Sequence, residues 1–203
     1  MIVLGLDTTG SDCSVSLVDE ARVLAHIYRD IGRGHAEVLA GMVEEAFQTA
    51  HLNPADIDRI AVCTGPGNFT GLRVALSFAK GFALPRDVPI VGINALEVTA
   101  QDLWIRDGEK HMAVYKDIRR GEAFYCEYKL GLPIMNPQSI SFDEAVEKSC
   151  HVDRGVETFS VDTRILAWLA IDRNPNAHPA EPLYARAPDA KLPGGVSPSK
   201  PAA

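Results

Sequence analysis

The segment Gly65-Pro66-Gly67-Asn68-Phe69-Thr70-Gly71-Leu72-Arg73, here called the signature segment, carries the most conspicuous candidate chemistry of the chain. It follows a short apolar stretch and opens a helical pattern, and backbone amides at such a helix start can hold an anion. It lacks the Gly-Lys-Ser/Thr ending of a Walker A loop, and its third glycine comes one residue late for GxGxxG. The spacing alone favours a tight turn and a helix whose N-cap is Asn68 or Thr70.

Two aspartates end strand-like stretches and are followed by polar turns. Asp7 precedes Thr8-Thr9-Gly10, and Asp117 precedes a turn with two arginines. Similar acidic turns contact phosphate or Mg²⁺ in the sugar kinase, actin and Hsp70 class, where extra glycines let the backbone approach the phosphate. Two interpretations stay open: a phosphate site between Asp7 and Asp117, and two ordinary hairpins with aspartate as the turn former.

The other residue types that bind metals or catalyse reactions show no recognised spacing. The six histidines form neither HxxxH nor HExxH, the four cysteines include no CxxC pair, and no Gly-x-Ser-x-Gly occurs. We therefore expect neither a catalytic constellation nor a metal site. His35 begins a helical pattern and is expected to be a contact or capping residue of that helix.

The composition limits the class of protein. The chain has 203 residues, 46% apolar and 23% charged, and a formal net charge of -7, which is typical of a globular protein. An acidic chain is poorly suited to bind nucleic acid alone, since neutralising phosphates needs a basic surface that a partner would have to supply. The sequence shows no cleavable signal and no apolar run of about 20 residues. Its cysteines suit a reducing compartment, so we expect a cytoplasmic protein without membrane contact.

Hydrophobic periodicity predicts an α/β fold in two related halves. Strands are expected at residues 2–7, 13–18, 22–28, 60–64, 90–93, 112–116 and 123–129, and helices at 36–50, 70–83, 95–105 and 163–171. The first three strands form an antiparallel meander, and the strand–helix alternation after them predicts parallel pairing through crossovers. Both halves begin with a strand, an aspartate, a turn and a strand, which indicates an internal duplication.

The helix predicted at residues 70–83 is apolar over more of its surface than contact with one sheet requires. One edge carries Leu72 and Leu76, and another carries Val74 and Phe78. The additional apolar edge predicts burial against a second helix of the chain or against a partner. The sequence does not say which edge faces outward.

Together these features resemble the TsaB (YeaZ) family. The resemblance rests on several segments: the signature segment with Ala79-Lys80-Gly81, Asp7-Thr8-Thr9, His35, residues 57–62, Arg119-Arg120-Gly121-Glu122 and Pro182-Leu183-Tyr184-Ala185-Arg186-Ala187-Pro188. It covers the first 100 residues well and the rest in patches. Asn68 stands where the family commonly has serine, and residues 151–162 lack the family's usual glycine-rich strand and turn.

The resemblance implies an actin-like fold of the class shared by Hsp70 and sugar kinases (ASKHA), with two lobes of mixed sheet, flanking helices and a reduced second lobe. We expect the lobes at residues 1–108 and 109–191 and a flexible tail at 192–203. The implied role is a non-catalytic scaffold or activating subunit, without the protease activity of glycoprotease-like peptidases. That subunit would belong to the complex that forms N6-threonylcarbamoyladenosine at position 37 of tRNAs reading codons that begin with A.

The resemblance also implies partners and an interface. The chain would pair with the catalytic paralogue TsaD, work with the ATPase TsaE, and reach tRNA through the complex; a homodimer is the alternative for the solitary chain. ATP and a metal would be bound by the partner subunits, and no cofactor by this chain alone. In the resembled family two first-lobe helices meet the partner as a bundle, which points here to Val38, Met42, Leu72, Val74, Leu76 and Phe78. The competing hypothesis is a nucleotide-dependent actin-like enzyme that uses Asp7 and Asp117 around a phosphate.

Overall fold

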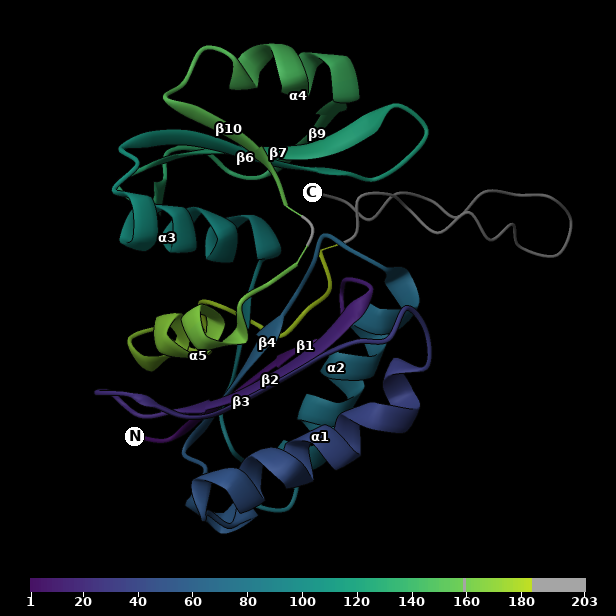
Figure 1. The fold of residues 1–203 in the computed structure, drawn as a ribbon, viewed down its shortest axis with the longest axis vertical. Coiled ribbons are helices and arrows are strands. Elements are labelled where there is room, and N and C mark those ends of the chain that lie inside the picture. The colour runs from purple at the N-terminus through teal and green to yellow at the C-terminus, as the bar shows by residue number, and fades with distance from the viewer. Residues whose placement is uncertain (159, 184–203) are drawn as a thin grey trace, which may run out of the picture.

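A computed structural model of the chain, which describes residues 1–158 and 160–183, shows two lobes stacked along the long axis (Figure 1). From one end to the other the layers are helix α4, the second sheet, helices α3 and α5, the first sheet, and helices α1 and α2. The predicted tail at 192–203 and residues 184–188 of the closing motif lie outside the described residues. No described helix has both the length and the apolar content needed to cross a membrane.

The first sheet has the strand order β3-β2-β1-β4-β5. Its strands are β1 (Val3–Asp7), β2 (Asp12–Val18), β3 (Val23–Asp30), β4 (Arg59–Cys63) and β5 (Ile90–Ile93). The first three strands are antiparallel, and β1, β4 and β5 are parallel. The predicted meander and the predicted crossovers are both confirmed. Helices α1 (His35–Ala50) and α2 (Phe69–Ala83) cover one face, and α5 (Thr163–Ile171) covers the other (Figure 1).

The second sheet has the order β10-β6-β7-β8, with β9 also paired to β7. Its strands are β6 (His111–Asp117), β7 (Glu122–Lys129), β8 (Leu132–Pro133), β9 (Gln138–Ser141) and β10 (Arg154–Glu157). Helices α3 (Ala95–Asp107) and α4 (Phe142–Ser149) lie on opposite faces (Figure 1). Strands β6 and β7 were predicted, but β8, β9, α4 and β10 were not. A 3₁₀ turn at Pro54–Asp56 was not predicted either.

The predicted duplication is visible in the pairing. Strand β1 pairs antiparallel with β2 and parallel with β4, which follows α1; β6 pairs antiparallel with β7 and parallel with β10, which follows α4. Asp7 and Asp117 end the first strand of each hairpin. Each carboxylate accepts a hydrogen bond from the backbone amide two residues ahead, Thr9 at 3.1 Å and Arg119 at 2.6 Å.

The packing divides the chain differently from the predicted boundary at residue 108. Helix α3 precedes that boundary, yet its Leu96, Ala100 and Leu103 pack in the core of the second sheet. Helix α5 follows it, yet Leu166 and Ala167 are buried against the first sheet. Helix α3 also contributes Ala95 and Val98 to the core of the first sheet, so it packs against both lobes, whereas α5 covers the first sheet.

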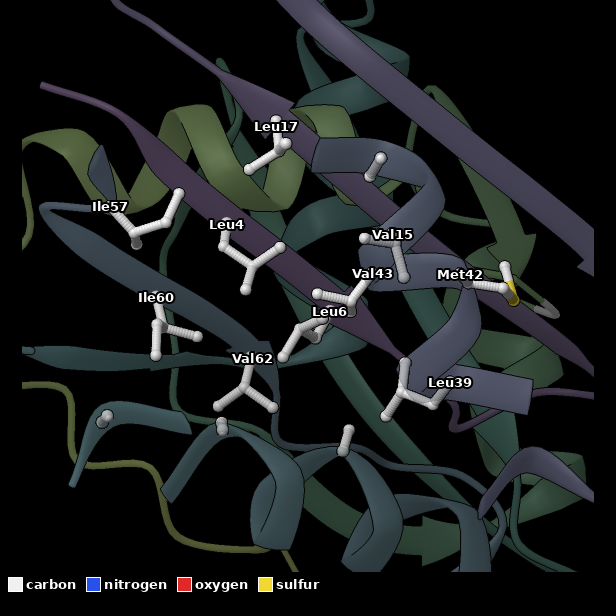
Figure 2. Packing of buried hydrophobic residues seen from close by; sticks show 14 of the residues in the cluster. Leu4, Leu6, Val15, Leu17, Leu39, Met42, Val43, Ile57, Ile60 and Val62 are labelled. Atoms are coloured by element: carbon white, nitrogen blue, oxygen red, sulfur yellow. The ribbon is translucent and has the colours of Figure 1, made fainter. Parts of the chain in front are cut away.

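The largest core lies between the first sheet and helices α1 and α2. Figure 2 shows side chains of this cluster from both layers, among them Leu4, Leu6 and Val15 of the sheet and Leu39 and Met42 of α1. All of these side chains are at most 1% exposed. Burying one large aliphatic side chain contributes roughly 1.5–3 kcal/mol, so this cluster is the main source of stability for α1 and α2.

Arg59 anchors helix α5 to the first sheet, and we expect Arg59→Met to cost about 2–3 kcal/mol. Its Nη1 donates hydrogen bonds to the carbonyl oxygens of Ala170 (2.6 Å), Ile171 (2.8 Å) and Arg173 (2.9 Å). Carbonyls at a helix C-terminus have no intrahelical donor, and a cation there also complements the helix dipole. Urea unfolding measures the loss in the free energy of unfolding.

Arg29→Met is the control for this prediction, because Arg29 pairs with Glu45 at the exposed surface. An ion pair there contributes at most about 1 kcal/mol. Equal losses for the two variants would contradict the anchoring role.

Candidate partner-binding face

The signature segment wraps around the turn that follows β1. The backbone amide of Asn68 donates to the Thr9 carbonyl oxygen at 2.7 Å, and Thr8 Oγ1 donates to the Gly71 carbonyl oxygen at 2.6 Å. A Cβ at Gly67 would lie 2.5 Å from the Thr9 carbonyl oxygen, and a Cβ at Gly71 would overlap that of Thr8. Glycine is required at both positions because backbone passes directly against backbone.

Asn68 is the N-cap of α2. Its Oδ1 accepts hydrogen bonds from the amides of Thr70 (3.0 Å) and Gly71 (3.4 Å). The interpretation of the segment as a turn with an N-cap at Asn68 is thus confirmed. Amides that an anion would need at this helix start are already bonded within the chain, so the geometry does not favour an anion site here.

Asp7 lies beneath the same turn and is fully buried. Its Oδ1 accepts from the amide and the hydroxyl of Thr9, at 3.1 and 2.8 Å, whereas its Oδ2 has no hydrogen-bond partner among the described residues. Burial raises the pKa of Asp7 from 3.8 to about 6, although the Thr9 hydrogen bonds oppose the rise. Asp117, its counterpart, is exposed on the second lobe. The paired aspartates of the competing hypothesis therefore have different surroundings.

We expect Asp7→Asn to gain stability relative to the natural chain as the pH rises. Because the folded pKa of Asp7 is raised, the fold binds this proton more tightly than the unfolded chain does. The resulting stabilisation is complete below the unfolded pKa and is lost as the pH rises through about 6. The free energy of unfolding of the variant, relative to that of the natural chain, should therefore rise by about 1–2 kcal/mol between pH 5 and pH 8. Urea unfolding at the two pH values measures it.

Asp19→Asn serves as the control for this titration. Hydrogen bonds from the amides of Ala21 and Arg22 lower the pKa of Asp19, so stability contributed by Asp19 is present above its unfolded pKa and is lost only in acid. The difference between this variant and the natural chain should not change between pH 5 and pH 8. If the difference in unfolding free energy between Asp7→Asn and the natural chain is also the same at pH 5 and pH 8, Asp7 does not titrate in this range.

The structure decides which edge of α2 faces outward. Leu72 and Leu76 are buried at 2% and 5% exposure and belong to the core of the first lobe. Val74 and Phe78, on the other edge, are only half-buried. The outward apolar edge of α2 is therefore the Val74/Phe78 edge.

Helix α1 shows the same division. Met42 is fully buried against the sheet (Figure 2), whereas Val38 is half-buried. Three of the six predicted interface residues are thus core residues and cannot meet a partner while the lobe is folded: Met42, Leu72 and Leu76. The prediction had left open which edge of α2 faces outward, because helical spacing identifies apolar edges but not which of them faces the sheet.

A groove of about 600 Å³ runs along the C-terminal half of α1 and across to α2. Its apolar lining includes Phe47, Phe78 and Phe82, whose rings stack with centroids 6.0 Å apart from Phe47 to Phe82 and from Phe78 to Phe82. Glu44 and His51 add polar groups to the lining. The prediction included Phe78 but not Phe47 or Phe82; the recurrence of phenylalanine four residues after Phe78 was the available signal.

Charged side chains accompany this apolar surface. Exposed acidic residues on α1 include Glu37 and Glu44, and exposed basic residues on α2 include Arg73 and Lys80. The Arg73 guanidinium lies 3.8 Å from the centroid of the exposed Phe69 ring. We call the outward surface of both helices the α1–α2 face. Aromatic side chains with a polar surround are typical of protein–protein interfaces.

Comparison with known proteins places the chain in a family. Residues 27–154 match the family model described as TsaD, tRNA N6-adenosine threonylcarbamoyltransferase. An Escherichia coli (strain K12) protein named tRNA threonylcarbamoyladenosine biosynthesis protein TsaB is 33% identical over 129 residues, which cover 64% of this chain and 55% of that protein. The chain belongs to the TsaB (YeaZ) family. A Bacillus subtilis (strain 168) member with the same name is 27% identical over 169 residues, 81% of this chain and 73% of that protein.

A solved structure confirms the predicted two-lobed α/β fold. The crystal structure of a Pseudomonas aeruginosa protein described as similar to peptidase YEAZ matches with a TM-score of 0.77 at 24% identity, covering 91% of this chain and 99% of that one.

The chain spans only part of the curated relatives that it matches: 55% of the length of the E. coli TsaB protein and 60% of that of the Buchnera aphidicola TsaB protein. Among the described residues no three histidine, cysteine, aspartate or glutamate side chains are grouped as metal ligands.

Proposed function

We propose that the chain is a non-catalytic subunit of the system that makes threonylcarbamoyladenosine in tRNA, and that it acts by pairing with a TsaD-type paralogue. The observation that carries the proposal is the α1–α2 face on a member of the TsaB family. Phe78 and Val74 stay partly exposed beside a groove lined by stacked phenylalanines. Aromatic side chains that line a groove and stay partly exposed are typical of sites of protein contact.

The non-catalytic role is supported by how the chain uses its signature segment. The amides at the start of α2 are bonded to Asn68, and the segment closes over the turn above Asp7. A phosphate held there would have to displace these hydrogen bonds. The hydrogen bonds between the signature segment and the turn after β1 instead fix the start of α2 on the first sheet. A helix whose outer face binds a partner must be fixed in this way.

The rest of the assembly follows from the same proposal. The TsaD-type partner and a TsaE-type ATPase supply the ATP and metal sites, and tRNA is contacted through the complex, which acts in the cytoplasm. The acidic charge of this chain, -7, suits a subunit that leaves the tRNA phosphates to its partners. The modified nucleoside is the one at position 37 of tRNAs that read codons beginning with A.

Reconstitution tests the proposed function. The chain, the TsaD-type paralogue and the TsaE-type ATPase of the same organism are purified and mixed with unmodified tRNA, ATP, bicarbonate and threonine, with the enzyme that supplies the threonylcarbamoyl group. Mass spectrometry of digested tRNA should detect threonylcarbamoyladenosine only when this chain is present. Full modification without the chain, or modification by the chain without the paralogue, would contradict the proposal.

A further inference from the structure

Helix α3 joins the two lobes, because its side chains belong to two cores. Ala95 and Val98 pack in a core of the first sheet, whereas Leu96, Ala100 and Leu103 pack in the core of the second sheet. A rotation of the second sheet relative to the first would have to move α3 against one of these cores. The contacts that fix the start of α3 to the first lobe therefore decide how freely the lobes can move.

The first turn of α3 is bonded to the first lobe at two points. The backbone amide of Ala95 donates to the carbonyl oxygen of Gly65, the first residue of the signature segment, at 2.7 Å. The carboxylate of Glu97 accepts a hydrogen bond from Arg173 Nη2 and forms an ion pair with it. Glu97 is only 7% exposed. Because a buried carboxylate that loses its cation is costly, this pair resists separation of the two segments that it joins.

Arg173 is itself fixed to the first sheet. Its carbonyl oxygen accepts a hydrogen bond from Arg59 Nη1, on β4, at 2.9 Å. Its Nη1 donates to His178 Nε2 at 3.4 Å, and the carbonyl oxygen of His178 accepts from the amide of Gly92, on β5, at 2.9 Å. The cation that meets Glu97 is therefore held by two strands of the first sheet.

Residues 173–183, here called the strap, run along the edge of the first sheet to the junction between the lobes. A Cβ at Gly92 would clash with the Pro179 carbonyl oxygen, so the strap passes directly against the edge strand β5. At its end the amide of Leu183 donates to the Thr64 carbonyl oxygen at 2.8 Å, and the Leu183 side chain packs against the core of the second sheet. The strap therefore ends in contact with both lobes, next to the start of the signature segment.

We infer that the Glu97–Arg173 ion pair and the strap lock the two lobes in one relative orientation. Two-lobed proteins that close around a ligand need a few residues at the junction that absorb large changes in backbone angles. Here a buried ion pair and backbone hydrogen bonds hold the junction instead. A locked chain does not open and close around a nucleotide, in contrast to the competing hypothesis of a nucleotide-dependent enzyme. The lock goes beyond the proposed pairing with a paralogue and does not depend on it.

Electron paramagnetic resonance tests the lock through the distance distribution between two spin labels, one on each lobe. Cys150, which is exposed on the second lobe, takes one label, and Gln48→Cys on α1 takes the other. The remaining cysteines are buried: Cys13, Cys63 and Cys126. This labelled chain should give one narrow distribution that stays unchanged when Mg-ATP is added. A distance that shifts with Mg-ATP would overturn the lock.

The same measurement on variants tests the ion pair. Arg173→Met removes the cation, and Arg106→Met is the control, because Arg106 pairs with Asp102 and Asp107 within α3. We expect Arg173→Met to widen the distance distribution at least about twofold and Arg106→Met to leave it unchanged. If the melting curve shows that Arg173→Met does not fold, Glu97→Gln takes its place, since it removes the charge and keeps the shape, and it should widen the distribution as well. An unchanged width in the folded variant would overturn the inference.

Discussion

Gly71→Ala is expected to destabilise the chain by about 3–5 kcal/mol, a large part of the 5–15 kcal/mol that keeps a typical domain folded. A Cβ at this position would overlap the carbonyl oxygen of Thr8, and no flexible side chain can yield there because the obstacle is backbone. Either the first turn of α2 or the turn after β1 must move. The movement would also break the hydrogen bond from Thr8 Oγ1 to the Gly71 carbonyl oxygen.

Gly81→Ala is the matched control in the same helix. No atom lies within 4 Å of the position that its Cβ would take, and Gly81 is exposed. Replacing an exposed helical glycine by alanine contributes about 0.5–1 kcal/mol of stability. Urea unfolding of both variants should therefore give changes of opposite sign. A Gly71→Ala variant as stable as Gly81→Ala would show that the signature segment is not a tight clamp.

Leu76→Glu and Phe78→Glu should differ sharply in folding, although they lie two residues apart on α2. Leu76 is 5% exposed within the main core, so its replacement places an unpaired charge among apolar side chains and should unfold the first lobe. Phe78 is half-buried on the outward edge, where a glutamate can reach water, so we expect a loss of about 1–2 kcal/mol. Circular dichroism melting curves distinguish the two. Unfolding by both substitutions would show that α2 is simply a core helix.

The first half of the fold could be predicted because its elements are long and strongly periodic. The alternating strands at residues 2–28 and the helices near 36–50 and 70–83 bury most of their apolar residues, so pattern and structure coincide. In the second lobe, β8, β9 and β10 have two to four residues and no buried side chain. Alternation over so few residues gives no readable period, and these strands exist because β6 and β7 offer partners.

The candidate site was predicted only in part, for reasons that lie in tertiary packing. The pattern located apolar edges on α2, but only the position of the sheet determines that Leu76 faces inward and Phe78 outward. The groove joins Phe47 of α1 to Phe82 of α2, two residues far apart in the sequence. The sheets that α3 and α5 cover were not predicted either, since the apolar face of a helix does not encode which sheet it packs against.

The most direct test of the α1–α2 face as the partner-binding site is the dissociation constant of the Phe78→Glu variant with the TsaD-type paralogue, measured by isothermal titration calorimetry. Val146→Glu is the control, because it places the same charge on a partly exposed apolar residue of α4, in the other lobe. We predict that Phe78→Glu, folded by its melting curve, binds at least about 100-fold more weakly than the natural chain, since docking would bury an unpaired charge. Val146→Glu should bind normally. A folded Phe78→Glu variant with the natural dissociation constant would contradict the account and place the interface elsewhere.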